Sequence, residues 1–361
     1  MQLKVQRSTE AQGPTSIEQL VNREIKVLDH GFVRVVDLMG SDAAVVQAAR
    51  VSYGKGTKKT TEDRGLIRYL MKHRHSTPFE MCEIKLHVKL PIFVARQWVR
   101  HRTANINEYS ARYSLLDKEF YLPDESYLNL ALKEQKIAAA LADARSKGQN
   151  DLFGTAGIGS KGLRATAAQS KVNKQGRETV LEESEALDHL STIKNLSEKA
   201  YRDYKRLLNR TADDKIIDEK REGLARELAR MVLPTNYYTQ WYWKTDLHNL
   251  FHFISLRADS HAQYEIQEYA KAIADVVAEW VPFSYEAFVD YRQGAQTLSK
   301  IEVELVKQLL SGLDVEQETS GLSVREWKEF ASRFALGEKS EANVESKPSK
   351  SKSGKAAKRK K

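Results

Sequence analysis

The chain has 361 residues, of which 41% are hydrophobic and 30% are charged, so it can bury the core of one large domain or of two smaller ones. No run of about twenty apolar residues occurs and no apolar segment follows Met1. We therefore expect neither a membrane span nor a secretory signal, and we expect a cytoplasmic protein. The single cysteine, Cys82, excludes an internal disulfide framework and a multi-cysteine zinc site.

The net charge of +9 is concentrated at the end of the sequence. Eight lysines and arginines and no acidic residue lie between positions 346 and 361, which leaves about +1 for the rest. A basic tail can contact nucleic acid, but a solvated tail is the more common case. We therefore expect residues 338–361 to be disordered, with no nucleic-acid partner apart from this tail and no membrane partner.

The first part of the chain predicts a strand and two helices. Residues 1–16 are polar and expected to be mobile. The largely apolar run Gly31–Met39 predicts a strand, a helix with Ser41 as its N-cap reaches Val51, and a further helix ends at Lys72. Pro78 restricts the residue before it, so His73–Glu80 is predicted to be a loop that displays polar side chains.

A strand, a helix and a second loop are predicted next. Apolar residues alternate with lysine and histidine over 84–90, which is typical of a half-buried strand with His87 on its polar face. Pro91 suits the first position of a helix that carries Gln97 and Arg100 near its end. Asn105–Ser110 is then expected to be a loop that can close over a ligand.

The same region is rich in cations. Residues 96–114 contain four arginines and a histidine. Planar guanidinium groups bind phosphate oxygens and carbonyls in pairs and stay charged at any working pH. The region therefore indicates a site for an anionic ligand, although a solvated basic helix end is the commoner explanation of an isolated Arg-His-Arg triplet.

The middle of the chain is predicted to be mainly helical. Residues 143–185 are rich in Gly, Lys, Ser and Ala without a sustained period, so they are expected to form a flexible insertion. A long amphipathic helix covers 186–208, and its aromatic residues are expected in the core or at a subunit interface. A shorter helix over 224–231 ends before Pro234, and the aromatic run 237–243 predicts a strand.

Histidines and capping residues mark the last third. His248 and His252 are four residues apart, the spacing of two metal ligands on a helix, but no cysteine lies nearby and no glutamate lies between them, so no metal site is predicted. Asp259 and His261 are expected to cap a helix that continues to Trp280. Capping boxes at 299–302 and 323–326 open further helices that end near glycines 312 and 337.

Two motifs resemble those of the flavin-dependent thymidylate synthases. Arg100, His101 and Arg102, followed after seven residues by Ser110, reproduce the family's Arg-His-Arg-x7-Ser motif, and Asn107, Glu108 and Arg112 match its extended form. Residues 256–263 match its second motif, Leu-Arg-x-Asp-x-His-Ala-Gln. Shorter elements match at His75 with Thr77–Glu80 and at Ala229–Pro234, so the resemblance spans about residues 31–292 apart from the insertion.

This resemblance implies a fold and a reaction. The fold is α/β (α+β), a sheet flanked by helices, in a domain over residues 17–300, with extra C-terminal helices over 301–337. The implied assembly is a homotetramer with active sites between subunits. The implied reaction is the methylation of dUMP to dTMP with 5,10-methylenetetrahydrofolate as carbon donor, tetrahydrofolate as coproduct, and NADPH reducing a bound FAD that supplies the hydride.

The resemblance also assigns residue roles. Arg257 is the catalytic residue, because a cation that faces the pyrimidine carbonyls stabilises the anionic ring and makes its carbon nucleophilic. Ser110 is assigned to substrate binding and not to covalent catalysis. The residues expected at dUMP are Gln97, Trp98, Val99, Arg100, Glu108, Tyr109, Ser110, Ala111, Arg112, Arg230 and Arg257. Those expected at FAD are His75, Thr77, Arg100, His101, Arg102, Glu108, Asp246, Leu247, His248 and His252.

Three other classes of protein stay open at this point. A folate-dependent thymidylate synthase of the unrelated type needs a cysteine nucleophile, and Cys82 is the one candidate. A nucleic-acid-binding protein is suggested by the basic tail alone. A metalloenzyme is suggested by His248 and His252.

Overall fold

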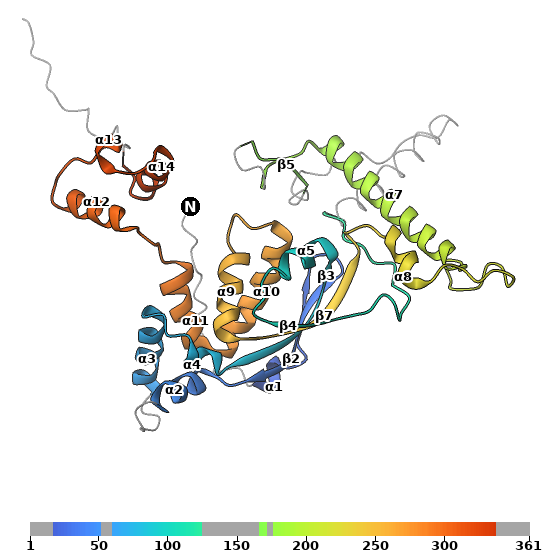
Figure 1. The fold of residues 1–361 in the computed structure, drawn as a ribbon, viewed down its shortest axis with the longest axis horizontal. Coiled ribbons are helices and arrows are strands. Elements are labelled where there is room, and N and C mark those ends of the chain that lie inside the picture. The colour runs from blue at the N-terminus through green and yellow to red at the C-terminus, as the bar shows by residue number, and fades with distance from the viewer. Residues whose placement is uncertain (1–16, 52–59, 125–165, 172–175, 337–361) are drawn as a thin grey trace, which may run out of the picture. The chain divides into compact units, whose positions relative to one another are not determined.

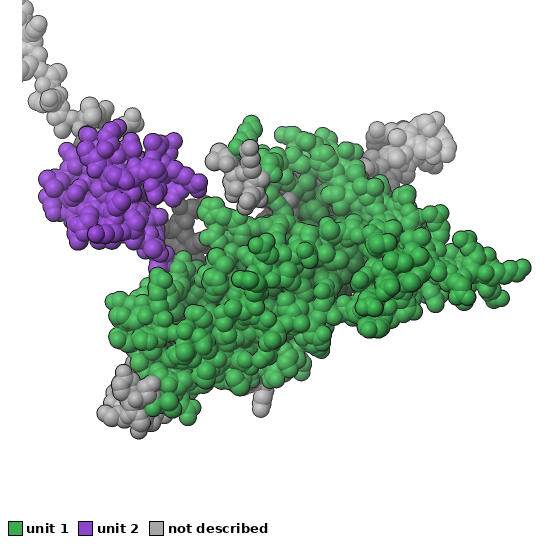
Figure 2. All heavy atoms as spheres, viewed as in Figure 1, with its two compact units in different colours: residues 1–294 green, residues 295–361 purple. Residues whose placement is uncertain are grey.

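A computed structural model describes residues 17–51, 60–124, 166–171 and 176–336 (Figure 1). The predictions for residues 1–16 and 338–361, and the glycine at 337, lie outside this part of the chain. The chain divides into two compact units, Met1–Gly294 and Ala295–Lys361 (Figure 2). None of the described helices is long and apolar enough to cross a membrane.

Unit 1 is built on an antiparallel sheet in the strand order β1-β2-β3-β7-β4. The strands are β1 (Glu24–Val27), β2 (Gly31–Met39), β3 (Glu83–Pro91), β4 (Asn105–Glu108) and β7 (Tyr238–Asp246). In β3 the residues Ile84, Leu86, Val88 and Leu90 are buried while the lysines and His87 between them are not, as their alternation predicts. Together with the flanking helices, this sheet confirms the α/β (α+β) class.

Three helices cover the buried face of this sheet. They are α5 (Ile92–Trp98), α9 (Leu247–Arg257) and α10 (Tyr264–Trp280) (Figure 1). Helix α10 packs against β1 and β2, and α5 and α9 pack against β7. Ten α10 residues are buried, among them Ile266, Tyr269, Ile273 and Val277, because their spacing places them on one side of the helix. The core therefore lies between this layer of helices and the sheet.

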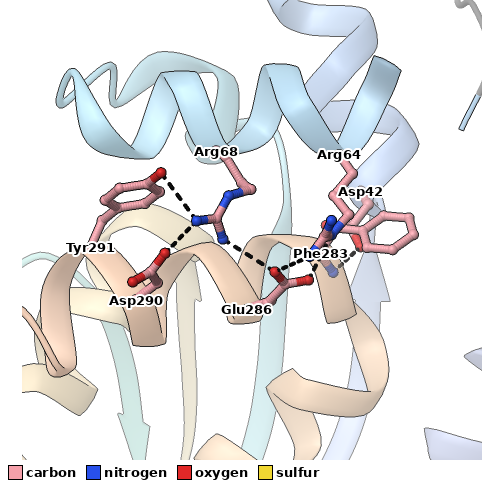
Figure 3. A network of polar contacts seen from close by, with 7 residues as sticks. All are labelled: Asp42, Arg64, Arg68, Phe283, Glu286, Asp290 and Tyr291. Carbon is pink, nitrogen blue, oxygen red and sulfur yellow. Dashed lines mark hydrogen bonds and ion pairs between the residues drawn. The ribbon is translucent and has the colours of Figure 1, made fainter. Parts of the chain in front are cut away.

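A second group of helices lies beside α9. It contains α2 (Asp42–Val51), α3 (Thr60–Lys72), α4 (Thr77–Glu80), α11 (Pro282–Phe288) and the π-helical turn η3 (Val289–Gln293). Ion pairs join α3 to α11 and η3, since Arg64 and Arg68 bond Glu286 and Arg68 also bonds Asp290 (Figure 3). Asp42 of α2 accepts hydrogen bonds from the backbone N–H groups of Phe283 and Ser284. These contacts hold the group together.

The remaining elements of unit 1 form a smaller cluster and a hairpin. Helix α7 (Glu183–Leu207) packs against η2 (Arg230–Val232), which follows α8 (Arg226–Ala229), around Tyr201, Tyr204 and Tyr237. Strands β5 (Ala167–Gln169) and β6 (Arg177–Val180) pair antiparallel. A short α1 (Ile17–Leu20) precedes β1.

Unit 2 contains α12 (Lys300–Leu310), α13 (Gln317–Ser320) and α14 (Val324–Arg333) around Leu305, Leu322 and Phe330. Both predicted capping boxes are present: Ser299 and Ser323 accept from the N–H groups of Glu302 and Glu326, whose carboxylates bond back. Gly312 has φ +77°, the left-handed conformation that ends α12 as predicted. The boxes are readable from sequence because both partners lie within one helical turn.

Two predicted loops are wrong in part. Thr77–Glu80 is a short helix, because Pro78 stands in its first turn, where a backbone N–H has no helical partner to lose. Asn105–Glu108 is a strand, because the free edge of β7 supplies hydrogen-bond partners to a segment of low strand propensity.

Three further expectations need correction. The insertion expected over 143–185 includes β5, β6 and the start of α7, and β5 and β6 pair with each other although local composition does not indicate strands. The helix expected over 224–231 is only a short α8 followed by η2. Gln263 and not Asp259 or His261 is the N-cap residue of α10, and Asp259 accepts instead from the N–H and ring Nδ1 of His261.

Candidate active site

The fold brings the two predicted motifs into contact. Arg100, His101 and Arg102 follow α5 and lead into β4, which pairs with β7, and β7 continues directly into α9, which ends at Arg257. The Nη2 atom of Arg257 donates a hydrogen bond of 3.0 Å to the backbone oxygen of Gln97 across 160 residues of sequence. The hydroxyl of Thr245 donates to the backbone oxygen of Thr103 at 2.9 Å. Helix α5 and strand β7 thus position both motifs.

His101 is the buried member of the first motif. Its ring centroid lies 5.7 Å from that of His252 and 5.6 Å from that of Phe253, and its Nε2 lies 3.2 Å from the hydroxyl of Thr103. Burial, followed by the charges of His252 and Arg257, lowers the pKa of His101 to about 4. The imidazole is therefore neutral near pH 7, and two residues expected at the flavin, His101 and His252, lie side by side.

Arg257 is a cation without a counterion in the part of the chain that the structure describes. Its guanidinium is half-buried, and its Nε atom is buried without a hydrogen-bond partner among the described residues. Burial, followed by the charge of Arg100, lowers the pKa of Arg257. Two guanidinium groups near one another, one of them partly desolvated, favour binding of a negatively charged ligand.

A network of side-chain hydrogen bonds orients Gln97. Its Nε2 donates to Oε1 of Gln263, whose Nε2 donates to Oε2 of Glu265 at 2.8 Å. Glu265 is only 1% exposed and also accepts hydrogen bonds from the hydroxyl of Tyr121 and from the guanidinium of Arg177. The carboxylate therefore has donors on both oxygens, and it fixes the direction of two successive amides.

Apart from Gln97, sequence reasoning did not assign this set of residues. Gln263 stands inside the second motif, which is a signal that was available, but neither Arg177 nor Glu265 carries a local pattern that indicates a role. Arg177 comes from β6 of the expected insertion. A cavity of about 550 Å³ lies between the β5–β6 hairpin and the start of α10, and Gln169, Arg177 and His261 line it.

A second group of expected dUMP residues gathers beyond β4. Glu108 accepts from the hydroxyl of Thr239 at 2.7 Å, and the N–H of Tyr109 donates to Gln240. Ala111 follows Ser110, whose hydroxyl accepts from the N–H of Arg112 at 3.4 Å. Arg112 pairs with Glu227 at 3.3 Å, and Nε of Arg230 donates to the backbone oxygen of the same residue.

These contacts separate the expected dUMP residues into two groups. Arg112 and Arg230 share Glu227, and Gln97 shares a hydrogen bond with Arg257. No hydrogen bond or ion pair between described residues joins Arg112 or Arg230 to Arg257. The group of Arg112 and Arg230 lies near α8, whereas the group of Gln97 and Arg257 lies between α5 and the end of α9.

Two expected contact residues do not present side chains to a ligand. Trp98 and Leu247 are both fully buried. The helical period places Trp98 on the core side of α5, where its ring centroid lies 4.5 Å from that of Phe253. Val99, Arg100 and Arg102 are exposed beside it. Trp98 and Leu247 can therefore contact a ligand only through their backbone atoms.

Three of the expected flavin residues line one cavity. His75, His248 and His252 surround a space of about 280 Å³ whose wall also includes Phe251 and Phe288. Thr77, at the start of α4, is exposed. Asp246 caps α9 by accepting from the N–H of Asn249 at 2.9 Å, so it already has a structural role. Helix α9 therefore carries His248 and His252 on the side that faces this cavity.

The described part of the chain gives no support to a cysteine nucleophile or to a metal site. Cys82 is fully buried, and burial, followed by the charge of Asp42, raises the pKa of its thiol to about 11. A thiol that stays protonated is a poor nucleophile. Within the described residues, no three His, Cys, Asp or Glu side chains gather as a metal site.

Comparisons with known proteins find similar sequences over most of the chain. A family model described as "Thymidylate synthase complementing protein" matches residues 34–283. The flavin-dependent thymidylate synthase of Ruegeria pomeroyi is 54% identical over 314 residues, covering 87% of this chain and 89% of the relative. That of Rickettsia bellii is 49% identical over 316 residues, covering 87% and 95%.

A solved structure shares the fold. The UMP/dUMP methylase PolB from Streptomyces cacaoi, bound with 5-Br dUMP, is 29% identical, with a TM-score of 0.56. The match covers 74% of this chain and 99% of that structure.

Proposed function

The chain belongs to the flavin-dependent thymidylate synthase family and catalyses the flavin-dependent methylation of dUMP to dTMP, and we propose which of its residues carry out this reaction. The observation that supports the proposal is the hydrogen bond between Arg257 and Gln97, which joins the second motif to α5, the helix that leads into the first motif. The cofactor is a flavin, FAD. The reductant is NADPH and the carbon donor is 5,10-methylenetetrahydrofolate.

The residues around α9 fit a flavin. His75, His248 and His252 line one cavity, and the neutral His101 packs beside His252. Arg100 and Arg102 are exposed cations that suit a diphosphate. We assign FAD binding to these residues with Thr77, Glu108, and the segment of Asp246 and Leu247. When bound, FAD supplies the hydride that completes the new methyl group.

The substrate dUMP is assigned to both groups of residues. Arg257 faces the pyrimidine, where its charge stabilises negative charge on the ring and so favours attack by the ring carbon. Gln97, held by Gln263, offers its remaining amide hydrogen and oxygen to the ring edge. Arg112 and Arg230 bind the phosphate, and the segment 108–111 completes the pocket.

The separation of these two groups supports an active site shared between subunits. A single chain presents Arg257 in one group and Arg230 in another without a direct link among described residues. A homotetramer would bring the two groups of different copies together. Within each copy, residues 17–300 form the catalytic domain and 301–337 a helical extension. We place the protein in the cytoplasm.

The cofactor is tested by the visible absorbance of the purified protein after FAD is added. Flavin bands should appear, and they should bleach after anaerobic addition of NADPH and dUMP. A protein that stays colourless would contradict the flavin site and would return the metal and nucleic-acid hypotheses to consideration.

The role of Arg257 is tested by substitution. Arg257→Ala should keep its flavin spectrum and lose turnover by about 100-fold or more, the usual cost of one group that stabilises developing charge. Flavin content is measured by absorbance and dUMP affinity by equilibrium binding. Loss of flavin with unchanged dUMP affinity would show that Arg257 serves the cofactor instead.

A further inference from the structure

Two arginines that none of the predicted roles include line the same cavity as the expected flavin histidines. Arg74 follows the end of α3, and Arg292 lies in η3. Both belong to the wall that also contains His75 and faces α9. Neither residue is part of the matched motifs.

The charges of this pair are not compensated within the described chain. Burial, followed by the charge of Arg74, lowers the pKa of Arg292, and no acidic residue contributes. No ion pair between described residues involves either guanidinium. The other arginines of α3 differ, since Arg64 bonds Glu286 and Arg68 bonds Glu286 and Asp290 (Figure 3).

The scaffold holds the two charges together in spite of their repulsion. The ion pairs in Figure 3 join α3 to α11 and η3, the elements that lead to Arg74 and Arg292. The guanidinium of Arg68 also lies over the ring of Tyr291, the neighbour of Arg292. Its Cζ atom is 4.8 Å from the ring centroid. Arg74 has φ +60°, which lies in the left-handed region. Residues other than glycine, asparagine and aspartate rarely adopt this backbone conformation. This conformation ends α3, since the N–H of His75 donates to the backbone oxygen of Leu70 at 3.0 Å.

The size and lining of the cavity restrict its ligand. Phe251 and Phe288 stack with ring centroids 4.4 Å apart and form an apolar wall, with His248 and His252 beside them. A space of about 280 Å³ is at the lower limit for a small-molecule site, so it holds one part of a ligand and not a whole dinucleotide. A ligand that fits has an anionic arm attached to a larger body that extends beyond the cavity.

We propose that Arg74 and Arg292 bind the anionic arm of a cosubstrate that reacts with the flavin. This inference rests on the proposed function. Two cosubstrates carry such an arm: NADPH has a 2′-phosphate, and the folate has glutamate carboxylates. Guanidinium pairs bind either group through paired hydrogen bonds, so the shared chemistry is an anion with two or three oxygens.

The test compares three variants of the full chain. Arg292→Gln removes one charge, and Arg74→Asn removes the other with a residue that tolerates a positive φ. Lys72→Gln is the control, because it removes an exposed positive charge two residues from Arg74 and outside the cavity wall. Each protein is assayed for flavin content, subunit assembly by sedimentation, NADPH and NADH oxidation, and dTMP formation with mono- and triglutamyl methylenetetrahydrofolate.

Both arginine variants should keep their flavin and assembly and raise the KM of one cosubstrate about ten-fold or more, with kcat changed less than about two-fold. The control should match the unaltered protein. If the variants prefer NADPH over NADH less than the unaltered protein does, the site binds the 2′-phosphate of NADPH. If they prefer the triglutamyl over the monoglutamyl folate less, the site binds the glutamate carboxylates.

Three outcomes would overturn the inference. Unchanged KM values for both cosubstrates would leave the pair without this role, and loss of FAD would assign it to the cofactor itself. Dissociation of the assembly would mean that the arginines meet acidic groups of another subunit. If the unaltered protein bound no flavin or formed no dTMP, the proposed function itself would fail, which is a separate result.

Discussion

At His101, burial and the charges of His252 and Arg257 act in the same direction, and the smaller effect of Asp246 opposes them. The ring is 7% exposed and lies beside His252 and Arg257, and each of these features disfavours the imidazolium form. A neutral ring packs on Phe253 and His252 without adding a third positive charge to the pair of Arg100 and Arg257. The histidine of a basic motif is thus an uncharged part of the site.

The pKa of about 4 has a consequence for stability without ligands. Between about pH 6.5 and pH 4 the unfolded chain binds a proton at His101 that the folded chain does not, so stability falls as the pH falls through this window. When the pH falls from about 7 to 5, the protonation of this group should lower the free energy of unfolding by about 2 kcal/mol. His101→Gln should remove that part of the pH dependence, as measured by urea unfolding of the flavin-free proteins. Identical slopes for both proteins would contradict the neutral assignment.

At the scale of elements, an ion pair connects the β5–β6 hairpin to the active site. Arg177 of β6 bonds the buried Glu265 at the start of α10, and Glu265 orients Gln263 and through it Gln97. Arg177 has a side chain 33% exposed, whereas that of Glu265 is 2% exposed. The hairpin therefore supports a positioning network although its own residues are distant in sequence from both motifs.

Substitution of the hairpin arginine tests this network. Arg177→Gln should raise the KM for dUMP about five- to ten-fold and change kcat less, because Gln97 is misoriented while Arg257 is intact. It should also lower stability by about 1–3 kcal/mol, since a buried carboxylate loses its cation. Arg177→Lys should restore much of the affinity. Equal KM and kcat values for the unaltered protein, Arg177→Gln and Arg177→Lys would show that the hairpin has no positioning role.

At the scale of the whole molecule, assembly decides whether the two groups of substrate residues meet. Arg257→Ala and Arg230→Ala each remove one group. If sites combine groups from different subunits, coexpression of the two inactive variants should restore about a quarter of the activity, because that fraction of sites receives both intact groups. Tagged copies allow mixed assemblies to be purified and assayed for dTMP formation.

A matched pair of variants serves as control for this experiment. Arg257→Ala and Arg100→Ala alter the same group, as the effect of Arg100 on Arg257 indicates. Mixing them should therefore restore no activity. Recovery in the control would show that Arg100 and Arg257 belong to different groups, whereas no recovery in the test pair would argue for sites within single chains.

The elements with a strong local pattern were predictable from sequence. The strands around Val35 and Leu86, the helix ending at Lys72, the aromatic strand through Trp241 and both capping boxes depend on periodicity or on partners within one turn. The motif residues Arg100 and Arg257 were identified because their spacing is specific to one family. Local information therefore determined the fold class, the family and the chemistry.

What only the tertiary structure decided depends on contacts between distant segments. Asn105–Glu108 became a strand because β7 offered a free edge, and Trp98 entered the core because α5 packs on α9 and β7. Glu265 received Arg177, and Arg74 came to face the cavity with Arg292, through packing over 88 and more than 200 residues of sequence. A sequence pattern reports periods and neighbours along the chain, whereas burial and charge compensation arise from residues that meet only after folding.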